Sequence, residues 1–171
     1  MRLVKYILFF IVALYLGVVL FMPKSQLYYK AEEFLSNKGV VIGNEKIVDM
    51  IGNFRLIHPV AYYQGADVAR ASNIDIKPLL LVNIVNIDNL EFTGVAKKFI
   101  KTYVAHLRAK HTIFKPNYVK LDLNGSFGEA TGYIDLKKRL VHIDITKPKN
   151  IAAIRRFITK GKKGWQYEYK F

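Results

Sequence analysis

Residues 119–145 read VKLDLNGSFGEATGYIDLKKRLVHIDI, and this stretch decides the fold class. Apolar residues alternate with lysine and aspartate over 119–123, and the alternation returns over 140–145. A period of two places successive side chains on opposite faces of a β-strand, and the Asn-Gly pair at 124–125 is typical of a hairpin turn. The stretch therefore predicts antiparallel strands with one apolar and one polar face, joined by that turn and by a basic turn at 137–139.

Shorter β-like runs extend the same pattern on both sides. From Gly39 onward, apolar runs are separated by Gly-Asn pairs at 43–44 and 52–53, which are typical of turns. Pro59 lacks a backbone N–H, so its run belongs to an edge strand or to a strand end. The C-terminus alternates aromatic and polar residues, which predicts a last half-buried strand whose buried face carries Trp165, Tyr167, Tyr169 and Phe171.

Two segments show helical spacing. Over 95–114 the apolar residues fit both a helical face and strand alternation, and we favour a helical turn followed by a strand. Asn150 is placed to cap an amphipathic helix that ends at Gly161. Its apolar side would carry Ile151, Ile154, Phe157 and Ile158. We therefore expect one antiparallel β-sheet domain of the mainly β (α+β) class, with a few short amphipathic helices.

The N-terminus carries a long apolar run. Tyr6–Met22 reads YILFFIVALYLGVVLFM, about 17 residues without a charge, which is the lower end of what spans a bilayer. It exceeds the apolar region of about 7–15 residues in a signal peptide, and no small-x-small cleavage motif follows it. A cleaved signal peptide and a buried core helix are the alternatives, and we favour an uncleaved anchor. Its membrane-facing residues would include Tyr6, Phe10, Leu14, Val18 and Met22.

The anchor sets the predicted domain organisation. Residues 1–23 form a transmembrane signal anchor, residues 24–38 a juxtamembrane helix capped by Ser25, and residues 39–171 a β-rich domain. The alternative for residues 24–38 is a linker helix packed on the domain. A short N-terminal tail with nothing to translocate favours an N-terminus inside the cytoplasm and a domain outside it. The chain has no cysteine, which is compatible with the bacterial periplasm.

Charge indicates the class of partner. The chain has 27 Lys and Arg against 13 Asp and Glu, a net charge of +14. Such a balance fits nucleic acid, anionic lipid or an acidic protein, and nucleic acid loses weight for a domain tethered outside the cytoplasm. The candidate basic contact surface comprises Lys137, Lys138, Arg139, Arg155, Arg156, Lys162 and Lys163. The alternative is that these charges only solubilise the surface.

Motifs for catalysis or metal binding are weak. His142 and Asp144 are two residues apart on a predicted strand and share a face, a spacing that could seed a metal site. A third ligand would have to come from His106 or His111, whose spacing puts them on opposite strand faces, so ordinary surface histidines are the favoured interpretation. The carboxylates Asp122, Asp135 and Asp144 alternate with basic residues, as on a solvated sheet face. We expect no enzyme, no metal and no cofactor.

The layout resembles a known family of envelope proteins. A signal anchor is followed by Lys77-Pro78-Leu79-Leu80, then by repeated apolar-x-apolar units with glycines and a basic turn over 119–145, and by Gly164-Trp165-Gln166-Tyr167. This is similar to the type II secretion protein N family and, more distantly, to AsmA-like proteins. Those are anchored in the bacterial inner membrane and carry periplasmic domains of long antiparallel sheet. This chain is shorter and more basic than most of them.

The resemblance implies two functions. The first is a non-enzymatic, single-pass inner-membrane component or scaffold of a cell-envelope machine, type II secretion-like or a flagellar-motor accessory, whose partners are other envelope proteins. The alternative is a lipid-binding or lipid-transfer module of AsmA-like type, in contact with the membrane and with anionic lipid. A contiguous exposed apolar groove would favour lipid binding, and a flat patch would favour the scaffold.

Overall fold

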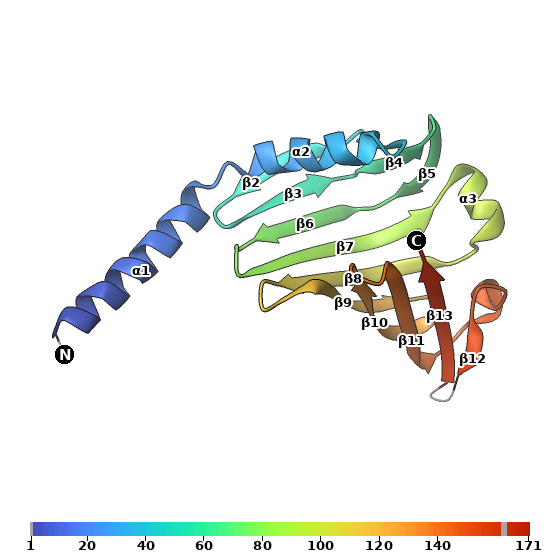
Figure 1. Cartoon of the computed structure of the whole chain (residues 1–171). Helices are drawn as coiled ribbons and strands as arrows, with labels where there is room; N and C mark the ends of the chain where they lie inside the picture. The colour runs from blue at the N-terminus through green and yellow to red at the C-terminus, as the bar shows by residue number, and fades with distance from the viewer. Residues whose placement is uncertain (1, 162–163) are drawn as a thin grey trace.

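The N-terminal run forms one long helix. The structure, a computed structural model, describes residues 2–161 and 164–171. Helix α1 (Arg2–Phe21) is long and apolar enough to cross a membrane, with a mean hydropathy of 2.5. It projects away from the rest of the molecule (Figure 1), and Val19 is its one buried residue among those described. Of the predicted anchor residues, Tyr6, Phe10, Leu14 and Val18 therefore lie on an exposed apolar helix, and Met22 directly follows it.

Pro23 separates α1 from α2 (Lys24–Ser36). Because Pro23 has no backbone N–H to donate, it ends the first helix and precedes the second. Ser25 was expected to cap α2, but this expectation is wrong. The helix begins one residue earlier, the capping position is Pro23, and no side chain caps it. Gly39, whose φ is +77°, follows the helix as expected and turns the chain into the sheet.

The remainder is a 13-stranded antiparallel sheet with one short helix and one 3₁₀ turn, which confirms the mainly β class. The strands are β1 (Val40–Gly43), β2 (Lys46–Met50), β3 (Asn53–Ile57), β4 (Val60–Tyr63), β5 (Ala66–Arg70), β6 (Asn73–Pro78), β7 (Val82–Phe92), β8 (Tyr103–Thr112), β9 (Lys115–Gly125), β10 (Gly128–Asp135), β11 (Leu140–Pro148), β12 (Thr159–Gly161) and β13 (Gly164–Lys170). Helix α3 (Gly94–Phe99) precedes β8, so the predicted helical turn followed by a strand is confirmed.

The strands follow one another as a meander. From β7 to β11 each strand pairs with the next in sequence, and β13 then pairs with β11. The first six form three longer strands, each interrupted once: β1 with β2, β3 with β4, and β5 with β6. In one half of these longer strands β1 pairs with β4 and β4 with β5, and in the other half β2 pairs with β3 and β3 with β6. The interruption between β3 and β4 falls at Pro59, at a strand end as predicted. Hairpin turns therefore alternate between two ends of the sheet.

The register separates the two faces of the sheet. One row of paired residues crosses nine strands and is entirely apolar: Ile47, Leu56, Ile74, Ile87, Leu107, Leu123, Ala130, Ile145 and Trp165. The row beside it points to the other face and is polar: Arg55, Asp75, Asn86, Arg108, Asp122, Thr131, Asp144 and Gln166. The period of two in the sequence thus extends across the whole sheet.

Two segments cover parts of the apolar face. Tyr28 of α2 packs on Phe54 and Leu56, which are 2% and 1% exposed, at the N-terminal side of the sheet. At the other side Ile151, Ile154 and Ile158 pack on the cluster that contains Phe127. The inward docking of these isoleucines was expected from the sequence. The helix that was expected to carry them, however, does not form.

The predicted C-terminal helix is replaced by one turn and a strand. Only the 3₁₀ turn η1 (Ala152–Ile154) is helical, and Thr159 and Gly161 instead pair with Gln166 and Gly164 of β13. Strand pairing with a distant segment overrides the local periodicity. β13 itself is confirmed. Tyr169 and Phe171, however, are 54% and 53% exposed, because only Trp165 and Tyr167 of its aromatics reach the covered cluster.

The hairpin turn predicted at 124–125 lies two residues later, at Ser126 and Phe127. Gly125 remains in β9, paired with Gly128 of β10 and Val104 of β8. A Cβ atom at Gly125 would lie 2.4 Å from the Tyr103 carbonyl oxygen, so this glycine allows two strands to approach closely. The pairing with β8 therefore extends β9 past the predicted turn.

Candidate functional site

The apolar face is open between its two covers. Figure 1 shows α2 across the first strands and the last strands curling away from them, with β6 and β7 uncovered in between. In this middle region Val85, Ile87, Leu107 and Ala109 are half-buried. The apolar face is therefore partly exposed in the middle of the sheet, and a hollow in this face, rather than a flat patch, would favour a lipid-binding module over a scaffold.

Beneath the C-terminal cover the apolar face is hollowed into a groove, a cavity of about 310 Å³. Its lining is apolar except for one threonine and one tyrosine: Phe92, Ile100, Thr102, Val104, Leu123, Phe127, Ala130, Ile143, Ile145, Ile154, Phe157, Ile158 and Tyr167. Pockets of about 300–1,000 Å³ with mostly apolar walls are typical of small-molecule sites. The cavity suits a hydrocarbon segment.

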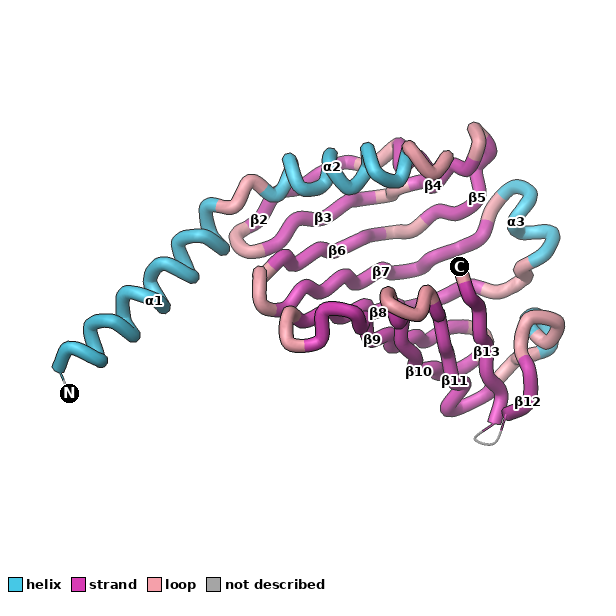
Figure 2. Tube along the Cα trace, viewed as in Figure 1, coloured by secondary structure: helices cyan, strands magenta, loops and turns pink. Residues whose placement is uncertain are grey.

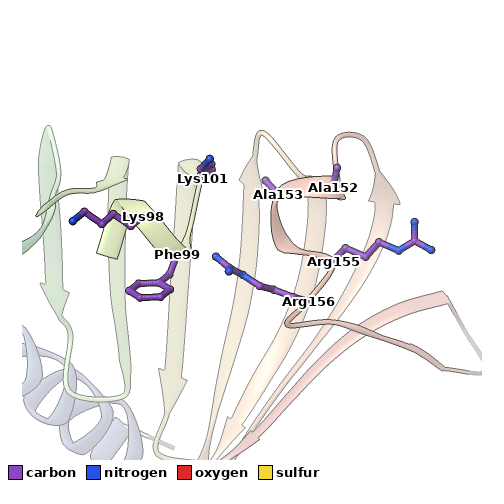
Figure 3. A pocket seen from close by; sticks show the side chains of 7 residues that line it. All are labelled: Lys98, Phe99, Lys101, Ala152, Ala153, Arg155 and Arg156. Carbon is purple, nitrogen blue, oxygen red and sulfur yellow. The ribbon is translucent and has the colours of Figure 1, made fainter. Parts of the chain in front are cut away.

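A basic depression adjoins the cavity. It has a volume of about 600 Å³ and is lined by Lys98, Phe99, Lys101, Ala152, Ala153, Arg155 and Arg156 (Figure 3). Ile100 and Ile154, which line the cavity, lie between lining residues of this depression in the sequence. The two hollows are therefore bordered by the same two segments, α3 with the start of β8 on one side and η1 on the other, and we call these two segments the lips. We call the depression the basic mouth.

Arg156 lies across the basic mouth. Its guanidinium carbon is 5.8 Å from the centre of the Phe99 ring on the opposite lip and 4.9 Å from that of Phe157. Arg155 points the other way and lies 5.6 Å from the Trp165 ring (Figure 3). Both arginines stack on aromatic faces, a contact worth about 0.5–1 kcal/mol at exposed sites. Within residues 2–161 and 164–171, no carboxylate oxygen lies within 4.0 Å of the mouth's cationic nitrogens.

A short polar contact holds α3 in place. The Thr93 hydroxyl donates a hydrogen bond to the carboxylate of Asp67 on β5, and Arg70 donates a second at 2.9 Å. The Thr93 hydrogen bond, followed by those of Arg70, lowers the pKa of Asp67. Gly94 has a φ of +51°, and a Cβ there would lie 2.2 Å from the Asp67 carbonyl oxygen. Only glycine fits this approach, which fixes the lip that carries Phe99 and Lys101.

The predicted basic surface is divided between two places. Arg155 and Arg156 line the mouth, whereas Lys137, Lys138 and Arg139 form the β10–β11 turn at the other end of the strands. Lys162 and Lys163 lie outside the described residues. Antiparallel strands carry the two described groups to opposite ends, and the contact role of these residues stays a prediction.

Sequence reasoning missed Lys98 and Lys101. The sequence feature that could have identified them is the basic run Lys97-Lys98-Phe99-Ile100-Lys101, in which Phe99 and Ile100 separate the charges. Only the fold shows that this run faces η1.

The histidines have separate partners. On the polar face His142 lies 3.2 Å from Asp144 and 3.4 Å from Glu168, and its ring stacks on Tyr133. His106 lies 2.7 Å from Asp88, and His111 contacts the Pro116 carbonyl oxygen at 3.0 Å. Among the described residues no three side chains of His, Cys, Asp or Glu gather as metal ligands. His142 and Asp144, which the sequence suggested as the start of a metal site, therefore contact each other on the polar face of the sheet.

Two of the buried polar groups serve the fold. Asp135 was expected on the solvated face but is 3% exposed, and it accepts a hydrogen bond from the Lys138 backbone N–H. Burial and then the nearby Asp135 charge raise the pKa of Tyr118. Tyr28 donates to Glu45 at 2.6 Å, and its burial followed by this bond raises its pKa far above the usual 10.0. Both arrangements stabilise turns and packing away from the groove.

Comparison with protein-family models, with curated proteins and with solved structures gives no significant match. The similarity to type II secretion protein N and AsmA-like proteins therefore stays a prediction, and the functional conclusion depends on the groove itself.

Proposed function

We propose that this chain is a membrane-anchored module that binds an anionic lipid, with the acyl chain in the apolar cavity and the charged headgroup at the basic mouth. The observation that carries the proposal is the position of the mouth. Four cationic residues without a carboxylate partner, in the part of the chain that the structure describes, border a cavity that has almost no polar lining. An amphiphile with a negative head matches both surfaces.

The energetics favour such a ligand. Each CH₂ group that leaves water contributes about 0.8 kcal/mol, and each lysine or arginine near an anionic headgroup about 1 kcal/mol. Arg156 already stacks on Phe99 and Phe157, so it is held in place before a headgroup arrives. The mouth would therefore orient a ligand whose affinity comes mainly from the cavity.

The polar face supports a binding role rather than a catalytic one. Its carboxylates are engaged in ordinary surface pairs, such as Arg55–Asp75 at 2.9 Å and Lys120–Asp122 at 3.1 Å. We also propose that the domain lies in the periplasm of a bacterium with α1 in the inner membrane, supported by the positive residues Arg2 and Lys5 before the apolar run.

A scaffold role in a multi-protein envelope assembly is the second candidate. It is favoured by the edges of the sheet: among the described residues β2 pairs with β3 alone and β12 with β13 alone. An unpaired edge can add a strand from another protein. In this case the partner would be an envelope protein of a type II secretion-like machine or a flagellar-motor accessory, and the groove would be secondary.

Charge reversal at the mouth tests the lipid proposal. The triple variant Lys98→Glu, Lys101→Glu, Arg156→Glu in the full-length chain should bind a fluorescent fatty acid at least about tenfold more weakly, because three favourable charges become repulsive. The readout is energy transfer from Trp165, the one tryptophan, which packs against the cavity cluster. The protein is held in phosphatidylcholine nanodiscs, and the uncharged methyl ester of the probe is measured in parallel.

The matched control reverses Lys137, Lys138 and Arg139, which changes the net charge equally at the other end of the strands. This variant should bind the fatty acid like the wild type, and the methyl ester should bind both triple variants equally. Equal loss of fatty-acid binding in both variants would show that only the total charge matters. Absence of energy transfer with the wild type would reject the proposal.

A further inference from the structure

All three hairpin turns between β2 and β9 at one end of the sheet carry exposed apolar side chains. Ile51 in the β2–β3 turn is 86% exposed, Leu80 and Leu81 in the β6–β7 turn are 39% and 41% exposed, and in the β8–β9 turn Ile113 is 48% and Phe114 79% exposed. We call these five residues the tip cluster. The β4–β5 turn at the opposite end is the polar pair Gln64-Gly65. Exposed apolar groups on successive turns mark a surface that meets an apolar phase.

The tip cluster lies beside the helix that is long enough to span a membrane. The Tyr15 hydroxyl of α1 donates a hydrogen bond to the Leu79 carbonyl oxygen at 2.9 Å. Lys24, just after α1, lies 3.8 Å from Asp49 near the end of β2. The Ile113 N–H donates to the Leu81 carbonyl oxygen at 3.1 Å, which joins the second and third turns. Figure 2 shows the three turns, in pink, one after another on the side where α1 leaves the sheet.

The contact with Tyr15 sets the depth of the turns. Tyr15 precedes the last residue of α1, Phe21, by six positions, or about 9 Å along a helix that rises 1.5 Å per residue. When α1 spans a bilayer, the backbone of Tyr15 lies below the membrane end of the helix by that distance, and its hydroxyl holds the β6–β7 turn beside this part of the helix. Apolar side chains of surface-bound segments reach about 5–10 Å into the headgroup and acyl boundary. The turns are therefore placed within this boundary.

We propose that the tip cluster inserts into the surface of the bilayer that α1 spans, so that the sheet stands on the membrane by three hairpin turns. Lys115, exposed directly after Phe114, is placed to meet the headgroups. The strands then lead from the membrane surface toward α3 and the basic mouth. This inference rests on α1 as a membrane helix and is independent of whether the cavity binds lipid.

Because the chain has no cysteine, single cysteines can report on each turn. Ile51→Cys, Leu81→Cys and Phe114→Cys are each labelled with an environment-sensitive fluorophore, and Ala66→Cys, exposed at the opposite end, is the control. The full-length variants are reconstituted at high lipid excess into vesicles of phosphatidylcholine and phosphatidylglycerol. A second set of vesicles carries a nitroxide quencher on the acyl chains.

We expect labels at the three turns to emit at shorter wavelength than the label at Ala66 and to be quenched by the acyl-chain nitroxide, while the control is not quenched. Labels at the turns that behave like the label at Ala66 would overturn the proposal. A shift to shorter wavelength without nitroxide quenching would also overturn it, because the turns would then be covered by protein. A retained β circular dichroism spectrum shows that each variant is folded.

Discussion

Phe54→Ala is expected to lower the free energy of unfolding by about 3–5 kcal/mol, the usual loss for a large aromatic side chain in a core. Phe54 is 2% exposed and packs against Tyr28 of α2, with ring centres 6.1 Å apart in an edge-on arrangement. Its removal leaves a void between α2 and β3, where Leu56 is also fully buried. Urea unfolding of the full-length chain in micelles, followed by the β circular dichroism signal, measures the loss.

Phe34→Ala is the matched control for this prediction. Phe34 is 64% exposed on α2, so the same substitution should change the free energy of unfolding by less than about 0.5 kcal/mol. A loss in the Phe54→Ala variant as small as that in the control would show that Phe54 is not part of a packed core between α2 and the sheet.

The second large effect concerns α1. Leu14→Arg places a charge near the centre of the apolar helix, where the change from leucine to arginine costs about 3–4 kcal/mol of insertion free energy. The described residues contain no second membrane span that could compensate this loss. Membrane insertion should fall by roughly a few hundredfold, at about 1.4 kcal/mol per factor of ten. Resistance of the protein to alkaline extraction from membranes measures insertion.

Leu3→Arg is the control for the anchor. Leu3 lies beside Arg2 at the start of α1, where a long basic side chain reaches the headgroups, so insertion should be nearly unchanged. Full retention of the Leu14→Arg variant in the membrane would mean that α1 does not hold the chain there.

Local patterns predicted the fold well because successive side chains of a strand point to opposite faces, so their polarity alternates with the environment of each face. The alternation in 119–123 and 140–145 predicted the two faces of the sheet, and the register shows these faces continuing through nine strands. The long apolar run predicted α1 for the same reason. These signals lie within single elements, so no knowledge of partners was required.

The failures arose where a distant segment decides the structure. The isoleucines over 151–158 have helical spacing, yet pairing of β12 with β13 unwinds most of that segment. Pairing of β9 with β8 moves the turn from Gly125 to Phe127. The basic mouth joins α3 to a segment more than 50 residues later in the chain, so a scan for charge clusters could not assemble it.

We propose that the cavity beneath the C-terminal cover holds an acyl chain. A photoactivatable fatty acid, added to membranes that contain the full-length wild-type protein, tests it most directly when the labelled residues are mapped by mass spectrometry. We predict cross-links on cavity residues such as Phe127, Ile154 and Tyr167. Cross-links confined to α1 and the tip cluster would contradict the claim, because the probe would then report only the surrounding bilayer.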